Sequence, residues 1–218
     1  MFKALTASAL ALAFMLPIAN AQSPAWTEAK ANNSNVKQRP SLLDGPNTDL
    51  PETEKKLGHH GPVVIEGILA ADGKLKEARV AVSSKASTLD EIAMAAANAS
   101  TFVPAKDADG NPIPIVISVP YSLVAYKSAT GGVYEYRCEQ FVRDMDWWRS
   151  VNPERPFSEH ELYKMELGLF ATPILLRGGM NNPEVARTAH ADFEKLWSAA
   201  IDHCRKKPKM LQKDALFR

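Results

Sequence analysis

The chain has 218 residues, of which 45% are hydrophobic and 23% are charged, as is usual for a protein that folds into one or two domains in water. Lysine and arginine number 26 against 25 acidic residues, so the formal net charge is +1, and the excess of positive charge that binds a nucleic-acid backbone is absent. No apolar run reaches the roughly 18 residues of a membrane-spanning helix, which argues against a multi-spanning membrane protein.

Residues 1–21 have the pattern of a secretory signal peptide. Lys3 supplies a positive charge, residues 4–16 are apolar, Pro17 breaks a helix, and residues 19–21 form a small-x-small cleavage site. We therefore expect cleavage after Ala21 and an exported chain that begins at Gln22 without a stable membrane span. The alternative is an uncleaved N-terminus that anchors the chain in the inner membrane, although the apolar stretch is short for a span.

The two cysteines, Cys138 and Cys204, both follow the predicted cleavage site. An even number of cysteines in an exported chain favours a disulfide. The two residues are 66 positions apart, so such a bond would stabilise the fold by about 4 kcal/mol in the chain-entropy description. Two buried free thiols are the alternative.

The N-terminal third changes character near residue 62. Residues 22–50 are polar and rich in turn-forming residues, and we expect them to form a flexible linker or arm. From Pro62 onward, alternating apolar residues predict a strand, and Asp72-Gly73 predicts a hairpin turn over residues 71–74. The returning strand places Ala78, Val80 and Val82 on one face.

A helix and a third strand follow. Thr88 and Glu91 have the spacing of a capping box at the start of a helix over residues 88–100. Residues 113–124 then alternate, and Pro120, which has no amide donor, favours an edge strand. One face of that strand carries Ile115, Ile117, Val119, Tyr121 and Leu123. The predicted order is β-β-α-β.

The last part of the chain, residues 133–208, has helical periodicity. Ser158 with Glu161 offers a second capping box, Asn182-Pro183 predicts the start of another helix, and Pro208 its end. Cys138 and Cys204 each lie on the apolar stripe of a predicted helix, as a disulfide between two packed helices requires. We read the basic tail from Arg205 to Arg218 as cations at a helix C-terminus followed by a frayed end, with contact to anionic lipid headgroups or an acidic partner as the alternative.

Seven short motifs over about Pro51 to Val124 resemble the C-terminal domain of the TonB family of energy transducers. In chain order they read Gly61-Pro62-Val63-Val64-Ile65, Ala71-Asp72-Gly73, Val80-Ala81-Val82-Ser83-Ser84, Leu89-Asp90-Glu91-Ile92-Ala93, Phe102-Val103-Pro104-Ala105, Gly110-Asn111-Pro112 and the alternating residues from Ile115 to Leu123. The resemblance implies an α+β fold, with a β-β-α-β TonB C-terminal-like domain over residues 51–126 followed by a mostly α-helical appendage over residues 133–208.

The resemblance also implies binding rather than catalysis. Domains of this family hold a short segment of outer-membrane receptors by adding it as a strand beside their last strand, where unpaired backbone groups are available. On this sequence the partner-binding edge would be the strand that carries Ile115, Ile117, Val119, Tyr121 and Leu123. The expected protein is periplasmic, takes part in transmembrane transport, and binds outer-membrane receptors or other envelope proteins. Pairing of two copies through their own edges leaves a homodimer open.

Three candidate sites of other kinds are weaker. His59-His60 could bind a metal, but adjacent residues of an extended segment point to opposite sides, so we read them as a solvated loop and expect no metal. His160-Glu161 begins a zinc-protease pattern, but Lys164 stands where the second histidine belongs. Asp144 reads as part of a solvated helix face. We expect no enzyme activity and no cofactor.

A second function remains open on the sequence. The β-β-α-β unit could pack permanently against the helical part and offer no free edge, which would make the protein a structural or assembly factor of the cell envelope.

Overall fold

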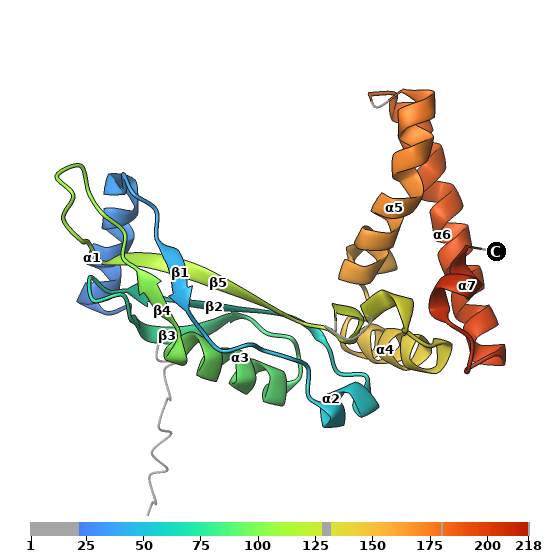
Figure 1. Cartoon of the computed structure of the whole chain (residues 1–218), viewed down its shortest axis with the longest axis horizontal. Coiled ribbons are helices and arrows are strands. Elements are labelled where there is room, and N and C mark those ends of the chain that lie inside the picture. Colours follow the sequence, from blue (N-terminus) through green and yellow to red (C-terminus); the bar gives the residue numbers. More distant parts are fainter. Residues whose placement is uncertain (1–21, 128–131, 180, 218) are drawn as a thin grey trace, which may run out of the picture.

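The computed structural model describes residues 22–127, 132–179 and 181–217. Figure 1 shows a long antiparallel sheet with helices packed on it, and a group of helices at one end of that sheet. The fold is therefore α+β with a mostly helical appendage, which confirms the predicted fold class. The predicted signal peptide, residues 1–21, lies outside the described residues.

The main sheet has the strand order β3-β2-β5 and is antiparallel throughout. The strands are β2 (Gly61–Leu69), β3 (Leu75–Val82) and β5 (Ile115–Leu123). The predicted hairpin turn is present: the Gly73 amide donates to the Ala70 carbonyl (3.0 Å), and the Ala70 amide donates to the Lys74 carbonyl (3.0 Å). The central strand β2 is paired on both sides, so β3 and β5 are the two edges.

The two faces of the sheet are covered by different helices. Val63 and Ile65 are fully buried and share a core with Leu89 and Ala93 of α3 (Ser87–Ala99). Ile68 has the opposite parity along β2 and packs on the other face, against α1 (Pro24–Asn32). The small alanine side chains of α3 leave little bulk between helix and sheet, which lets the helix lie close to the strands.

Residues 22–50, expected to form a flexible linker or arm, contain regular structure. This arm contains α1, a 3₁₀ turn η1 (Asn33–Asn35) and the strand β1 (Ser41–Asp44), which pairs with β4 (Thr101–Val103) in a second small sheet. Trp26 is only 3% exposed, and it packs with Ala29 against Ile68. Trp26 thus docks the arm on the sheet, although the polar composition of the arm gave no indication of such an apolar contact. A short helix, α2 (Glu52–Leu57), then leads into β2.

The appendage contains four helices joined by short turns. They are α4 (Cys138–Val151), α5 (Glu161–Gly178), α6 (Pro183–Lys206) and α7 (Gln212–Leu216), with 3₁₀ turns η2 (Ala125–Lys127), η3 (Gly132–Tyr134) and η4 (Phe157–Glu159). Their core is aromatic: Trp197 meets Phe141 edge-to-face at 5.2 Å between ring centroids and Tyr163 at 5.1 Å. This cluster continues into the sheet–α3 core, so both parts of the chain share one apolar interior.

The helix ends only partly follow the sequence signals. Asn182 caps α6 as predicted, because its side chain accepts from the amides of Glu184 and Val185. The N-cap positions differ from the predicted ones, because Ala86 precedes α3 without a side-chain cap and His160, rather than Ser158, caps α5. The Asp90 carboxylate instead reaches back from α3 to the Ser84 amide (2.9 Å), and the His160 ring accepts from the Leu162 amide at the start of α5 (3.1 Å). The His160 bond satisfies an amide of the helix itself, whereas the Asp90 bonds hold the segment that precedes α3.

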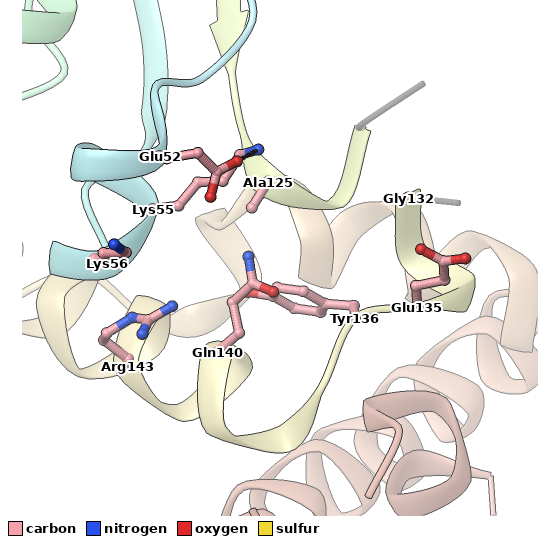
Figure 2. Close-up of a pocket in the computed structure, with 9 residues that line it drawn as sticks. All are labelled: Glu52, Lys55, Lys56, Ala125, Gly132, Glu135, Tyr136, Gln140 and Arg143. Atoms are coloured by element: carbon pink, nitrogen blue, oxygen red, sulfur yellow. Dashed lines mark hydrogen bonds and ion pairs between the residues drawn. The ribbon is translucent and has the colours of Figure 1, made fainter. Parts of the chain in front are cut away.

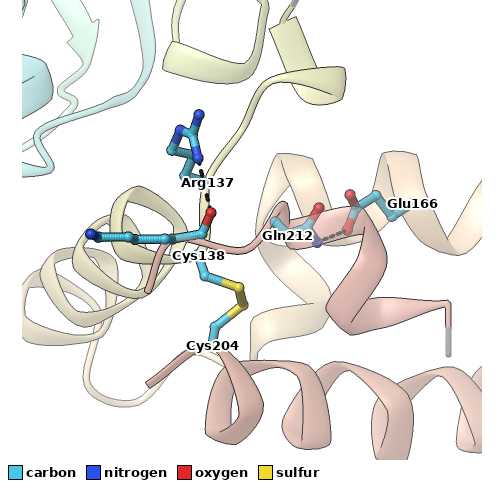
Figure 3. The surroundings of a disulfide bond; sticks show 6 residues. Arg137, Cys138, Glu166, Cys204 and Gln212 are labelled. Carbon is cyan, nitrogen blue, oxygen red and sulfur yellow. Dashed lines mark hydrogen bonds between the residues drawn. A yellow bond between two sulfur atoms is a disulfide. The ribbon is translucent and has the colours of Figure 1, made fainter. Parts of the chain in front are cut away.

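The predicted disulfide joins Cys138, at the first turn of α4, to Cys204, near the end of α6, with 4.7 Å between their Cα atoms. Figure 3 shows the bond beside the segment that precedes α4 and beside α7. In the same layer the Gln212 side-chain amide donates to the Glu166 carboxylate (2.9 Å). The tail is thus docked rather than frayed over residues 212–216, where Gln212 and Leu216 are buried.

Gly73 offers a test of the hairpin. It has φ +78°, and a Cβ atom there would collide with the backbone carbonyl oxygen of Phe102. Gly110 has a similar φ of +81° but open space around it. We expect Gly110→Ala to lower the free energy of unfolding by about 1 kcal/mol, and Gly73→Ala by about 3 kcal/mol or more. Urea unfolding of the two variants checks this, and equal losses would contradict the close approach.

Removal of the disulfide should loosen the appendage. We expect the double variant Cys138→Ala/Cys204→Ala to lose about 3–4 kcal/mol of stability, because the bond closes a long loop in the unfolded chain. Urea unfolding of the oxidised protein, the reduced protein and the variant checks this. An unchanged midpoint on reduction would show that the bond contributes nothing.

Candidate functional site

The two edges of the main sheet differ in regularity. β5 pairs with β2 over nine consecutive residues without interruption, from Gly61 opposite Leu123 to Leu69 opposite Ile115. The β2–β3 pairing is broken at two places, and Glu77 in β3 has a positive φ of 48°. Bulges of this kind twist an edge away from further pairing. The β5 edge is therefore the one suited to accept another strand.

The backbone groups of β5 that face outward can be assigned from Val116. Its amide donates to the Asn33 side chain (3.0 Å), and its carbonyl accepts from the same side chain (2.9 Å). In an antiparallel pair, alternate residues direct both backbone groups to the same side. The outward-facing residues are thus Val116, Ser118, Pro120 and Ser122. Pro120 occurs at a position where its missing amide donor leaves the pairing with β2 intact.

The five residues predicted as the partner-binding edge alternate with these outward-facing residues along β5. Ile115 and Leu123 are buried, and Ile117, Val119 and Tyr121 are partly buried on the α3 side of the sheet. By the same alternation, their backbone groups point toward β2. Whether these side chains touch a partner stays a prediction. The backbone donors and acceptors that face outward belong to the alternate residues of β5 that lie between these five. The bonds from Asn33 to Val116 show which residues face outward, and Asn33 lies 83 positions before Val116 in the sequence.

Both ends of the β5 edge have side-chain partners. At the beginning, the Asn32 side chain donates to the Pro114 carbonyl (3.1 Å), next to the two bonds between Asn33 and Val116. At the other end, the Ser122 hydroxyl donates to the Glu161 carboxylate of α5 (2.9 Å). Ser118 and Pro120 lie between these contacts and are exposed.

A comparison with known families identifies the domain to which this sheet belongs. Residues 46–123 match the family model described as the Gram-negative bacterial TonB protein C-terminal. These residues form a TonB C-terminal domain. They include all three strands of the main sheet, whereas α1 and the helical appendage lie outside the match. No curated protein matches the chain.

The TonB C-terminal domain indicates the general function. Domains of this family bind and transduce rather than catalyse, and they indicate a transport-related function in the cell envelope, with envelope proteins as partners. Among the described residues, no helix is long and apolar enough to cross a membrane. Within the same residues, no group of three or more His, Cys, Asp or Glu side chains is arranged to hold a metal ion.

Two buried histidines join the TonB C-terminal domain to the appendage. His60, which directly precedes β2, is 3% exposed, so the expectation of a solvated loop is wrong for this residue. Its Nε2 atom lies 2.8 Å from Nε2 of His160, which is equally buried at the start of α5. Trp147 of α4 covers the His60 ring at 5.0 Å between centroids. Local sequence did not predict the burial of His60, because its partner His160 is 100 residues away in the chain.

The hydrogen bonds determine the protonation of this pair. Nδ1 of His160 accepts from the Leu162 amide, so its proton is on Nε2 and is donated to Nε2 of His60. His60 must then carry its proton on Nδ1, which donates to the Gly58 carbonyl (2.8 Å). Both rings are neutral. Burial lowers the pKa of His60 to about 4 and the pKa of His160 to about 2.

Two buried carboxyl groups lie in the appendage. Asp144, expected on a solvated helix face, is only 3% exposed and accepts a hydrogen bond from the Tyr136 hydroxyl (2.5 Å). Burial raises its pKa to about 7, and burial likewise raises the pKa of Glu166 to about 7. The sequence did not predict the burial of either residue, because carboxylate side chains usually face solvent.

A cavity of about 280 Å³ lies where α2 meets α4. Figure 2 shows Glu52, Lys55 and Lys56 on one wall, and Gln140 and Arg143 on the other. Lys55 forms an ion pair with Glu52 (2.5 Å), so much of the positive charge is already balanced. The cavity is a polar gap between the two parts of the chain, without a strong preference for one sign of charge.

The histidine pair predicts a pH-dependent stability. Because the folded state favours neutral rings, the contribution of the pair to the free energy of unfolding is fully present above the ordinary histidine pKa of 6.5. That contribution is lost as the pH falls toward 4. Between pH 7 and pH 5, we expect the wild type to lose roughly 2–4 kcal/mol more than the variant His60→Asn/His160→Asn.

Urea unfolding at the two pH values measures this difference. Asp144 and Glu166 act in the opposite sense, because their raised pKa values favour the folded state in acid, but they are present in both proteins and cancel in the comparison. The control His190→Asn, at an exposed position, should leave the pH dependence unchanged. Equal losses in the wild type and the double variant would contradict the neutral buried pair.

Proposed function

We propose that this protein is an exported periplasmic binding protein that holds TonB-dependent outer-membrane receptors by adding a receptor segment as a strand to the β5 edge. The observation that carries the proposal is the regularity of β5, which pairs with β2 over nine residues without a bulge while the opposite edge is interrupted. An unbroken edge presents its backbone groups at the spacing of a partner strand.

The central part of the edge supplies the bonds. The amide and carbonyl of Ser118 face outward and would exchange two hydrogen bonds with one residue of the incoming strand. The carbonyl of Pro120 would accept a third. Bonds of this kind contribute about 0.5–1.5 kcal/mol each, so this stretch alone supports binding in a weak to moderate range, with side-chain contacts adding specificity.

The proposal extends to the organisation of the chain. Residues 1–21 would direct export and be removed, residues 51–126 would be the binding domain, and residues 133–208 would be the disulfide-linked helical region. The histidine pair and the shared apolar core support the view that this region is fixed to the domain rather than tethered to it. No catalytic step or cofactor is part of this function. A homodimer formed through two β5 edges would compete with the receptor for the same groups.

A second function is favoured by the contacts at both ends of the edge. The Asn33 side chain already bonds the backbone of Val116, and the Glu161 carboxylate accepts from the Ser122 hydroxyl. If the remaining groups are also inaccessible, the protein acts as a structural or assembly factor of the envelope with a sealed edge. Hydrogen exchange on the isolated protein distinguishes the two functions, because slow amides throughout residues 115–123 would favour the sealed edge.

Calorimetric titration with N-terminal plug peptides of TonB-dependent receptors tests the main proposal. We expect the chain from Gln22 to Arg218 to bind such a peptide, and Ser118→Pro to weaken binding at least tenfold, because it removes an outward amide and places a ring in the path of the added strand. Pro120→Ser adds an amide on the same edge and should bind as well as the wild type or better.

Circular dichroism must show that both variants are folded. Undiminished binding by Ser118→Pro would contradict pairing at this edge. No binding by the wild-type protein would contradict the receptor-binding function.

A further inference from the structure

The N-terminal arm makes two hydrogen bonds to the outward backbone of β5 and a third to Pro114, which directly precedes the strand. The Asn33 side chain bonds both the amide and the carbonyl of Val116, and the Asn32 side chain bonds the carbonyl of Pro114. A side-chain amide has one donor group and one acceptor group, as a backbone peptide has. Asn33 therefore makes at Val116 the pair of bonds that a residue of an added strand would make.

The arm is held in this position by contacts away from the edge. Trp26 and Ala29 of α1 are buried against Ile68 and Val116 on the outer face of the sheet. The guanidinium of Arg79 lies 4.1 Å from the centre of a Trp26 ring, and the Ser23 hydroxyl donates to Glu77 (2.7 Å). These contacts bind α1 to the sheet, so Asn33 remains beside Val116 unless the whole helix leaves.

We infer that Asn33 is a specificity-determining residue that stops an added strand at Val116 and confines it to the half of the β5 edge from Ser118 to Ser122. The inference rests on the proposed function and defines the register of the same site. An incoming strand that continued past Ser118 toward the start of β5 would meet the Asn33 side chain in place of free backbone groups. A segment of about five residues fills the remaining length.

The confined register also determines the chemistry of the segment. Its residue opposite Ser118 shares the outer face with Glu66 and Arg79, which form an ion pair (2.8 Å), so a polar side chain suits that position. The two flanking residues fall on the face of Ile117 and Val119, where apolar side chains suit. The expected ligand is a short extended segment with apolar, polar and apolar residues in alternation, which turns away from the sheet beyond Ser118.

Hydrogen exchange and titration together test the stop. In the wild type we expect the Val116 amide to exchange slowly and the Ser118 amide to exchange fast. Asn33→Ala should expose the Val116 amide. Asn35→Ala is the matched control, because Asn35 is exposed in the same 3₁₀ turn and makes no side-chain hydrogen bond to the described residues. The control should exchange like the wild type.

The titration uses a plug peptide in a five-residue form and in two forms lengthened by three residues at either end. We expect the wild type and Asn35→Ala to bind all three forms with affinities within about twofold. Asn33→Ala should bind one lengthened form roughly five- to tenfold tighter than the short form, because two further backbone bonds become available.

The outcomes separate the stop from the function on which it rests. Tighter binding of a lengthened peptide by the wild type, or no gain in Asn33→Ala, would overturn the stop and leave receptor binding standing. Failure of the wild type and of Asn33→Ala to bind any of the three peptides would overturn receptor binding, and the register with it.

Discussion

The uninterrupted ladder between β2 and β5 is the constraint on which the site depends. Nine consecutive pairs fix the direction of every backbone group in β5, and the two bonds at Val116 reveal which of them face outward. The same ladder explains why Pro120 is tolerated in a strand of this length, since its missing donor falls on the side away from β2. On the opposite edge, the bulges of β3 remove the regularity that an added strand would need.

The helical appendage is coupled to the sheet by polar as well as apolar contacts. The apolar core runs without a break from Ile65 to Trp197, and the neutral pair of His60 and His160 lies where the two parts meet. Each imidazole nitrogen of the pair has a partner, so the polar atoms are buried without an unpaired donor or acceptor. Such a network has one satisfied proton arrangement, which ties the start of β2 to the start of α5.

Local patterns predicted much of the fold. Alternation identified the three strands, Asp72-Gly73 identified the hairpin, Pro120 identified an edge, and apolar stripes placed Cys138 and Cys204 on helices that pack together. These features depend on residues close in sequence. The bulges in β3 were not visible, because Val80 and Val82 alternate regularly in the sequence although they lie opposite Ile65 and Val64, on different faces.

The features that sequence patterns missed depend on partners far along the chain. The burial of His60 follows from His160, and the docking of a polar arm follows from Trp26 against Ile68. The capping boxes failed for two different reasons: at α3 the backbone carbonyl of Ala86 accepts from the first helix amides, and at α5 the His160 ring accepts from the Leu162 amide. In each case a contact with a distant residue, or a competing hydrogen bond, selected a local structure that the sequence pattern alone did not identify.

The residues that frame the β5 edge all lie outside residues 46–123, which match the TonB C-terminal family. Asn32 and Asn33 come from the arm before the domain, and Glu161 comes from the appendage after it. The family domain supplies a sheet with an edge whose backbone groups depend on the sequence only where a proline, here Pro120, removes an amide. The segments on either side of the family domain therefore contact both ends of that edge, and under the proposed function they limit how much of it a partner reaches.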